Sequence, residues 1–97
     1  MLKKKQRVHL HGPALRALND AIHERDHHKC VICGRYVSPT EKFHHEPPAA
    51  GRSDEIEKGV TLCLACHAER HFGANCNAIR DEIRLYLAKI YGGQNGY

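Results

Sequence analysis

Two pairs of cysteines constrain the fold of this chain more than any other feature of its sequence. Cys30 and Cys33 enclose two residues, and Cys63 and Cys66 do the same. Thiolates at this spacing can place two sulfurs on one tetrahedral ion, so the two pairs together complete a four-sulfur site. Sulfur ligands that leave no open coordination position suit a structural Zn²⁺. We therefore expect zinc to hold the two ends of the intervening segment together.

The length of the chain makes such a staple valuable. The 97 residues predict a single domain over 1–97, and a domain of this size buries little apolar surface. We find no segment apolar enough for a membrane span or a signal peptide, and expect a cytoplasmic protein with no membrane partner. In a reducing cytosol, paired cysteines indicate metal ligands rather than disulfides. Cys76, the fifth cysteine, is then expected to be a small packing residue.

Apolar periodicity and turn residues predict the other elements. Pro13 can open a helix, and Gly73 can end a short one. The expected elements are a helix over 13–26, strands over 41–46 and 60–62, and a helix over 64–72. The strands are too short to stand alone as a sheet, so other contacts must hold them.

A last helix is expected after Asn77, which is a candidate N-cap, and before Gly92, which is a candidate stop. Its one-sided apolar stripe consists of Ile79, Ile83, Tyr86, Leu87 and Ile90. A stripe at helical spacing is typical of core packing. We expect it to pack against the first helix.

The net charge of +4 weakly favours a polyanionic partner. Basic residues gather near the start of the chain, at Lys3, Lys4, Lys5 and Arg7. By itself such a run is more typical of a solvated terminus than of a dedicated DNA contact.

Histidines flank the second cysteine pair and occupy the long segment between the pairs. Twenty-nine residues (34–62) separate the pairs, against about 15–20 in a plain zinc ribbon. His44 and His45 are neighbours, so on a strand they point to opposite faces, which predicts different roles for them. His67 and His71 are four apart and share a helix face. Together with His44 they would provide three ligands for one metal and leave positions open for water and phosphate.

The segment after His67 does not follow the pattern of zinc proteases. Glu69 follows His67 by two residues and therefore projects away from the face that His67 and His71 share. Peptide hydrolysis is accordingly disfavoured.

The combined pattern resembles the HNH endonuclease family over residues 30–72. The resemblance rests on Cys30–Gly34 (CVICG), His44–Pro47 (HHEP) and Gly59–His67 (GVTLCLACH). It implies an α+β fold, with a small ββα-metal core and a structural four-cysteine zinc site between N- and C-terminal helices. It also implies that His45 is the general base, that His44 and His67 bind a divalent ion, and that His71 is a further ligand.

The sequence departs from the family at the middle catalytic position, between His45 and His67. The family has Asn nine positions before the final histidine, and Lys58 stands there instead. Asn braces the loop by hydrogen bonds, which Lys can donate but not accept. Lys58 either points towards a phosphate or impairs the enzyme. Arg52 and Arg70 are further candidates for phosphate contacts.

The resemblance implies a metal-dependent endonuclease that hydrolyses DNA phosphodiester bonds. Because the chain offers one such site, we expect it to nick one strand per event. We expect double-stranded DNA as partner, a monomer or weak dimer, and Mg²⁺ or Mn²⁺ as catalytic ion, with Zn²⁺ or Ni²⁺ as alternatives. One alternative is a catalytically impaired, zinc-containing module that binds nucleic acid. Another is a metal-site protein that makes protein–protein contacts, which the basic run does not favour.

Overall fold

The computed structural model describes residues 7–92, so the predicted contribution of Lys3, Lys4 and Lys5 lies outside the described residues. The described elements are the helices α1 (Gly12–Arg25), α2 (Leu64–Phe72) and α3 (Cys76–Tyr91), the strands β1 (His44–His45) and β2 (Gly59–Val60), and the short 3₁₀ helices η1 (Ala49–Gly51) and η2 (Ile56–Lys58). This is a small α+β fold whose hairpin and following helix match the expected ββα-metal core. None of the described helices is long and apolar enough to cross a membrane.

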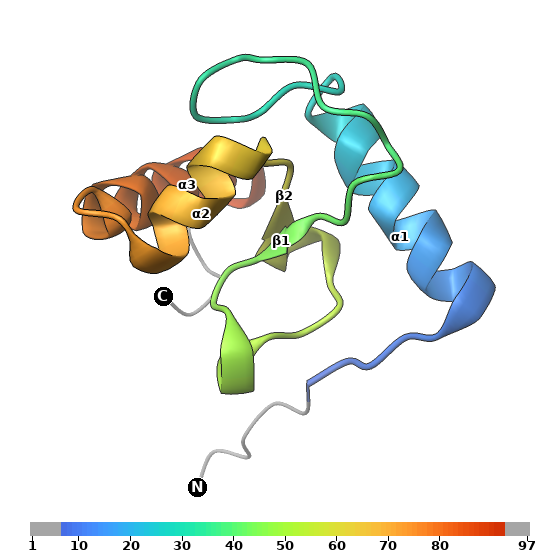
Figure 1. Ribbon diagram of the computed structural model, residues 1–97. Coiled ribbons are helices and arrows are strands. Elements are labelled where there is room, and N and C mark those ends of the chain that lie inside the picture. The colour runs from blue at the N-terminus through green and yellow to red at the C-terminus, as the bar shows by residue number, and fades with distance from the viewer. Residues whose placement is uncertain (1–6, 93–97) are drawn as a thin grey trace, which may run out of the picture.

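The two strands form an antiparallel pair in the middle of the fold. His44 pairs with Val60, and His45 pairs with Gly59. Figure 1 shows α1 on one side of this hairpin, with α2 and α3 side by side on the other. Residues of the hairpin therefore stand between α1 on one side and α2 and α3 on the other.

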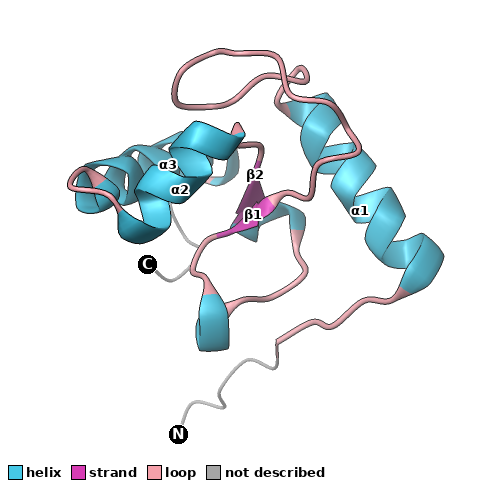
Figure 2. Ribbon diagram, in the orientation of Figure 1, coloured by secondary structure: helices cyan, strands magenta, loops and turns pink. Residues whose placement is uncertain are grey.

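Both strands are shorter than predicted. Next to them, the amide of Thr61 donates to Oδ2 of Asp26 over 2.8 Å, and the amide of Phe43 donates to Oδ1 of Asn19 over 2.9 Å. These two amides point away from the partner strand, because hydrogen-bonded pairs alternate along an antiparallel ladder, so the side chains satisfy the outer edges of the hairpin. Figure 2 accordingly shows mostly loop between α1 and α2.

The apolar face of α3 forms the core with residues of the cysteine segments and of β2. The buried cluster comprises Cys30, Val37, Val60, Leu62, Cys63, Ile79, Ile83 and Leu87. The expectation that this face packs against α1 holds at Tyr86, whose ring faces the guanidinium of Arg25. It is wrong for Ile79, Ile83 and Leu87, which pack in the buried cluster, while α1 packs mainly on β2 and η2. Ile90, at the end of the predicted stripe, is 44% exposed.

The start of α3 also differs from the prediction. The helix begins at Cys76, with Asn75 at the cap position, so Asn77 already lies in the first turn. The side chain of Asn77 accepts a hydrogen bond from Arg80 rather than capping the helix. The last residue described, Gly92, ends α3 as predicted and has a left-handed φ of 86°.

Candidate functional site

The four paired cysteines come together as the spacing predicted. Their sulfur atoms all lie within 4.8 Å of one another, and Sγ of Cys33 and Sγ of Cys63 are 3.7 Å apart. Sulfurs on a tetrahedral zinc ion, with bonds of about 2.3 Å, lie about 3.8 Å apart. Burial raises the pKa of the Cys66 thiol, and the other three thiols raise it further, which is the repulsion that a bound cation would relieve. The cluster could hold a structural zinc ion.

The second cysteine pair is built into the start of α2. Cys63 occupies the cap position, and its sulfur accepts a hydrogen bond from the amide of Cys66. The helix then continues directly into His67 and His71. Any ion held by the cysteines therefore fixes the position of these imidazoles.

His44, His67 and His71 form a second group of possible metal ligands. Their ring nitrogens lie within 4.8 Å of one another, and the two Nε2 atoms of His67 and His71 are 3.1 Å apart. Among the described residues, Nε2 of His44 is buried and has no hydrogen-bond partner. A buried nitrogen without a partner is costly, and a metal ion would satisfy it. The three residues therefore fit a divalent ion.

Two of these imidazoles are also held in the form that binds metals. Burial lowers the pKa of His67, and the neighbouring His44 and His71 lower it further. Burial and the neighbouring His44 and Arg70 lower the pKa of His71. Neutral imidazole is the metal-binding form, so less proton displacement is needed on binding.

A buried ion pair lies beside the histidine group. The Glu46 carboxylate is fully buried and receives two hydrogen bonds of 2.8 Å from the guanidinium of Arg70. Burial raises the pKa of Glu46, but the interactions with His44 and Arg70 outweigh it and lower the pKa to about 2. The expectation that Arg70 contacts phosphates is therefore not supported, since its fork already binds a carboxylate. Nothing in the spacing of Glu46 and Arg70 pointed to this pair.

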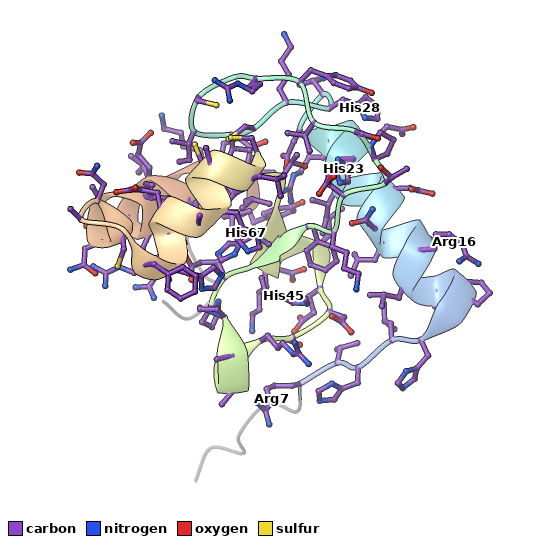
Figure 3. All side chains as sticks on the ribbon, in the orientation of Figure 1. Arg7, Arg16, His23, His28, His45 and His67 are labelled. Carbon is purple, nitrogen blue, oxygen red and sulfur yellow. The ribbon has the colours of Figure 1, made fainter. Side chains whose placement is uncertain are left out.

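His45 faces away from the histidine group, as the alternation of a strand predicted. Its Nε2 lies 2.7 Å from Oδ1 of Asp54, and its ring packs against the ring of Phe43 with centroids 4.5 Å apart. Figure 3 labels His45, on β1, and His67, on α2. Burial raises the pKa of Asp54, but the Leu10 amide and His45 lower it by more. Sequence reasoning missed Asp54, which stands in an irregular loop with no period to reveal it.

Lys58 lies at the end of η2 and is not among the residues that face the histidine group. Its Nζ is 3.7 Å from Oε2 of Glu55, and its carbonyl accepts the amide of Glu46 over 3.0 Å. The backbone of Lys58 therefore contributes to the hairpin, while its charge is paired with Glu55.

The loop around η2 is instead braced from α1. Nη1 of Arg25 donates to the carbonyl of Ile56 over 2.7 Å, and Nη2 donates to the carbonyl of Gly59 over 2.6 Å. Arg25 also forms a two-point pair with Asp26, whose Oδ2 accepts the Thr61 amide. Sequence reasoning did not single out Arg25, because the two carbonyls that it binds lie more than 30 residues away in the chain.

Comparison with known proteins finds a family match over the segment that contains both groups of possible metal ligands. Residues 30–73 match the family model of HNH endonucleases. A curated relative named Anaredoxin, from Nostoc sp. (strain PCC 7120), is 33% identical over 46 residues, which are 47% of this chain and 60% of that protein. The match thus spans about three fifths of that relative's length, and no solved structure matches the chain.

The family comparison confirms the resemblance seen in the sequence. The residues that the HNH model matches, 30–73, include all four paired cysteines as well as His44, His45, His67 and His71.

Proposed function

We propose that this protein is a metal-dependent endonuclease that hydrolyses DNA phosphodiester bonds and nicks one strand per event. One observation carries the proposal. Two adjacent residues of β1 serve opposite faces, with His44 turned into the group of three imidazoles and His45 held by a carboxylate. A metal ligand and a general base thereby stand side by side on one rigid element.

The contact with Asp54 determines which nitrogen of His45 can act as base. An ionised carboxylate only accepts hydrogen bonds, so Nε2 of His45 carries the proton that points at Oδ1 of Asp54. The lone pair is then on Nδ1. This nitrogen takes a proton from water as the water oxygen attacks phosphorus in line. The bond from phosphorus to the 3′ oxygen breaks, and the product keeps a 5′ phosphate.

His44, His67 and His71 would hold the catalytic ion, Mg²⁺ or Mn²⁺, with Zn²⁺ or Ni²⁺ as alternatives. A divalent ion supplies charge neutralisation at the phosphate oxygens and at the leaving oxygen. The chain itself fixes the three imidazoles, because His44 is on β1 and the other two are on α2. Imidazoles positioned in advance cost little reorganisation when the charge develops.

Relaxation of supercoiled plasmid in the presence of Mg²⁺ or Mn²⁺ tests this function. We expect the parent protein to convert the plasmid to the open circle, and His45→Ala to abolish the conversion while keeping the zinc and the melting temperature. His11→Ala, which removes an exposed histidine, is the matched control and should cut at the parent rate. Parent-rate cleavage by His45→Ala would refute the role of His45.

A second candidate is a catalytically impaired module that binds nucleic acid without cutting it. The observation that favours it is Lys58, which stands where the family has Asn and is paired with Glu55. Under this alternative, the parent protein binds duplex DNA in a mobility-shift assay and leaves the plasmid supercoiled with either ion. Open circle from the parent but not from His45→Ala decides for the enzyme.

A further inference from the structure

The segment that precedes α1 runs along the loop that carries Asp54. The amide of Asp54 donates to the carbonyl of Val8 over 2.8 Å, and the amide of Val8 donates to Oγ of Ser53 over 2.7 Å. The amide of Leu10 donates to Oδ2 of Asp54 over 2.8 Å. Three hydrogen bonds therefore tie residues 8–10, which lie outside the family match, to residues 53–54 within it.

These contacts hold the carboxylate of Asp54 at both oxygens. Oδ1 faces Nε2 of His45, and Oδ2 accepts the Leu10 amide. With both oxygens engaged, the carboxylate cannot rotate without losing a hydrogen bond, and its side chain is 13% exposed. The loop is fixed on its other side by Ser53, which is buried and donates to Oε2 of Glu55 over 2.6 Å.

We propose that Asp54 is a positioning residue for His45 and that Val8–Leu10 sets the Asp54 carboxylate, so the N-terminal segment is part of the active centre. This inference rests on the function proposed above. A neutral imidazole without a hydrogen-bond partner populates both tautomers, and its ring can rotate about the bond to Cβ. The carboxylate selects the tautomer that leaves Nδ1 as the proton acceptor.

The inference also bears on Arg7, the one residue of the basic run that the structure describes. Arg7 is exposed and directly precedes Val8, and it lies below His45 in Figure 3. A polyanion that contacts this part of the chain would thus meet it next to the residues that hold Asp54. The N-terminal segment is accordingly expected to matter for the rate of cleavage as well as for DNA affinity.

The first test measures the tautomer of His45 and needs no cleavage. Ring ¹⁵N shifts are recorded on the zinc-loaded full chain without other divalent ions, at about pH 8, where an unperturbed imidazole is neutral. The His45 signals are assigned from their loss in His45→Ala. We expect Nε2 protonation in the parent and a mixture of tautomers in Asp54→Ala. An unchanged single tautomer in Asp54→Ala would overturn the proposal.

The second test measures single-turnover nicking with Mn²⁺. Asp54→Ala should lower the maximal rate about 10- to 100-fold, as loss of an orienting partner does at other metal sites, with unchanged Mn²⁺ affinity. If Asp54→Ala does not fold, Asp54→Asn replaces it in the test, because Asn keeps the size of the side chain. We expect Asp54→Asn to nick slowly as well. Asp81→Ala removes an exposed carboxylate and should keep the parent rate. Parent rates in both Asp54 variants would overturn the proposal.

A third test examines residues 8–10 through one hydrogen bond, the one that the Leu10 amide donates to Asp54. Leu10→Pro removes the N–H that binds Oδ2 of Asp54, whereas Leu10→Ala keeps it. We expect a mixture of His45 tautomers and slow nicking in Leu10→Pro but not in Leu10→Ala. The same tautomer and the same rate in both variants would show that Val8–Leu10 does not set the Asp54 carboxylate. Should the parent not cut at all, the endonuclease proposal fails, while the tautomer measurement still decides the positioning.

Discussion

Arg70 on α2 donates two hydrogen bonds to the buried carboxylate of Glu46, which directly follows β1. They run from Nε to Oε2 and from Nη2 to Oε1, and both are 2.8 Å long. Oε2 of the same carboxylate lies 3.7 Å from Nε2 of His44. The ion pair therefore joins the helix that carries His67 to the strand that carries His44. It lies beside the imidazoles and fixes the distance between the two elements that supply them.

Arg70→Ala is expected to destabilise the fold by about 3–5 kcal/mol, because it leaves the Glu46 carboxylate buried without its charge partner. Arg80→Ala breaks an exposed pair with Asp81 and should cost less than about 1 kcal/mol. Urea unfolding followed by circular dichroism measures both. Equal midpoints for the two variants would show that the buried pair does not hold α2 to the hairpin.

Loss of zinc is expected to unfold the domain. Structural zinc sites contribute about 10–16 kcal/mol in small peptides, which is as large as the entire stability of an ordinary domain, about 5–15 kcal/mol. We expect one zinc per chain by elemental analysis, and loss of cooperative melting in Cys63→Ala or after a strong chelator. Cys76 lies outside the four-sulfur cluster, so Cys76→Ala should keep both the bound zinc and the cooperative melting transition. Native melting of Cys63→Ala would contradict the zinc site.

His71→Ala is expected to weaken binding of the second divalent ion without loss of zinc. Loss of a group that only hydrogen-bonds a metal ligand lowers metal affinity about tenfold or more. Loss of a ligand itself should lower the Mn²⁺ affinity by at least as much. Titration with Mn²⁺, followed by its paramagnetic resonance signal, measures the affinity, and His11→Ala is the control. Unchanged Mn²⁺ affinity in His71→Ala would remove this residue from the ligand set.

Lys58→Asn is expected to leave the nicking rate unchanged. Arg25 already braces this loop through the carbonyls of Ile56 and Gly59. Arg25→Lys, which cannot form the two-pronged contact, should lower both the melting temperature and the nicking rate. Plasmid relaxation by the two purified variants compares them directly. A large gain in rate for Lys58→Asn would show instead that Lys58 impairs the parent enzyme.

Short-range spacing predicted the parts of this molecule that depend on neighbours in the sequence. The bounds of α2, Leu64–Phe72, are those expected from its start near Cys63 and its stop at Gly73. The gathering of His67 and His71 follows from one helical turn. The opposite orientation of His44 and His45 follows from the alternation of a strand.

Contacts between distant irregular segments could not be predicted in the same way. Asp54 holds His45 from a loop, and Arg25 binds carbonyls of another loop, so neither position has a period or a spacing rule. Asp26 and Asn19 bind the outward-facing amides of Thr61 and Phe43, and these contacts depend on tertiary structure, which no local pattern encodes.

Under the proposed function, α2 starts with ligands of a structural ion and continues into ligands of a catalytic one, so we expect the two ions to be bound in a fixed order. The four-sulfur position would set the helix first, and the imidazole position would be complete only afterwards. Supply of one element would thereby govern whether the other, however abundant, can be used.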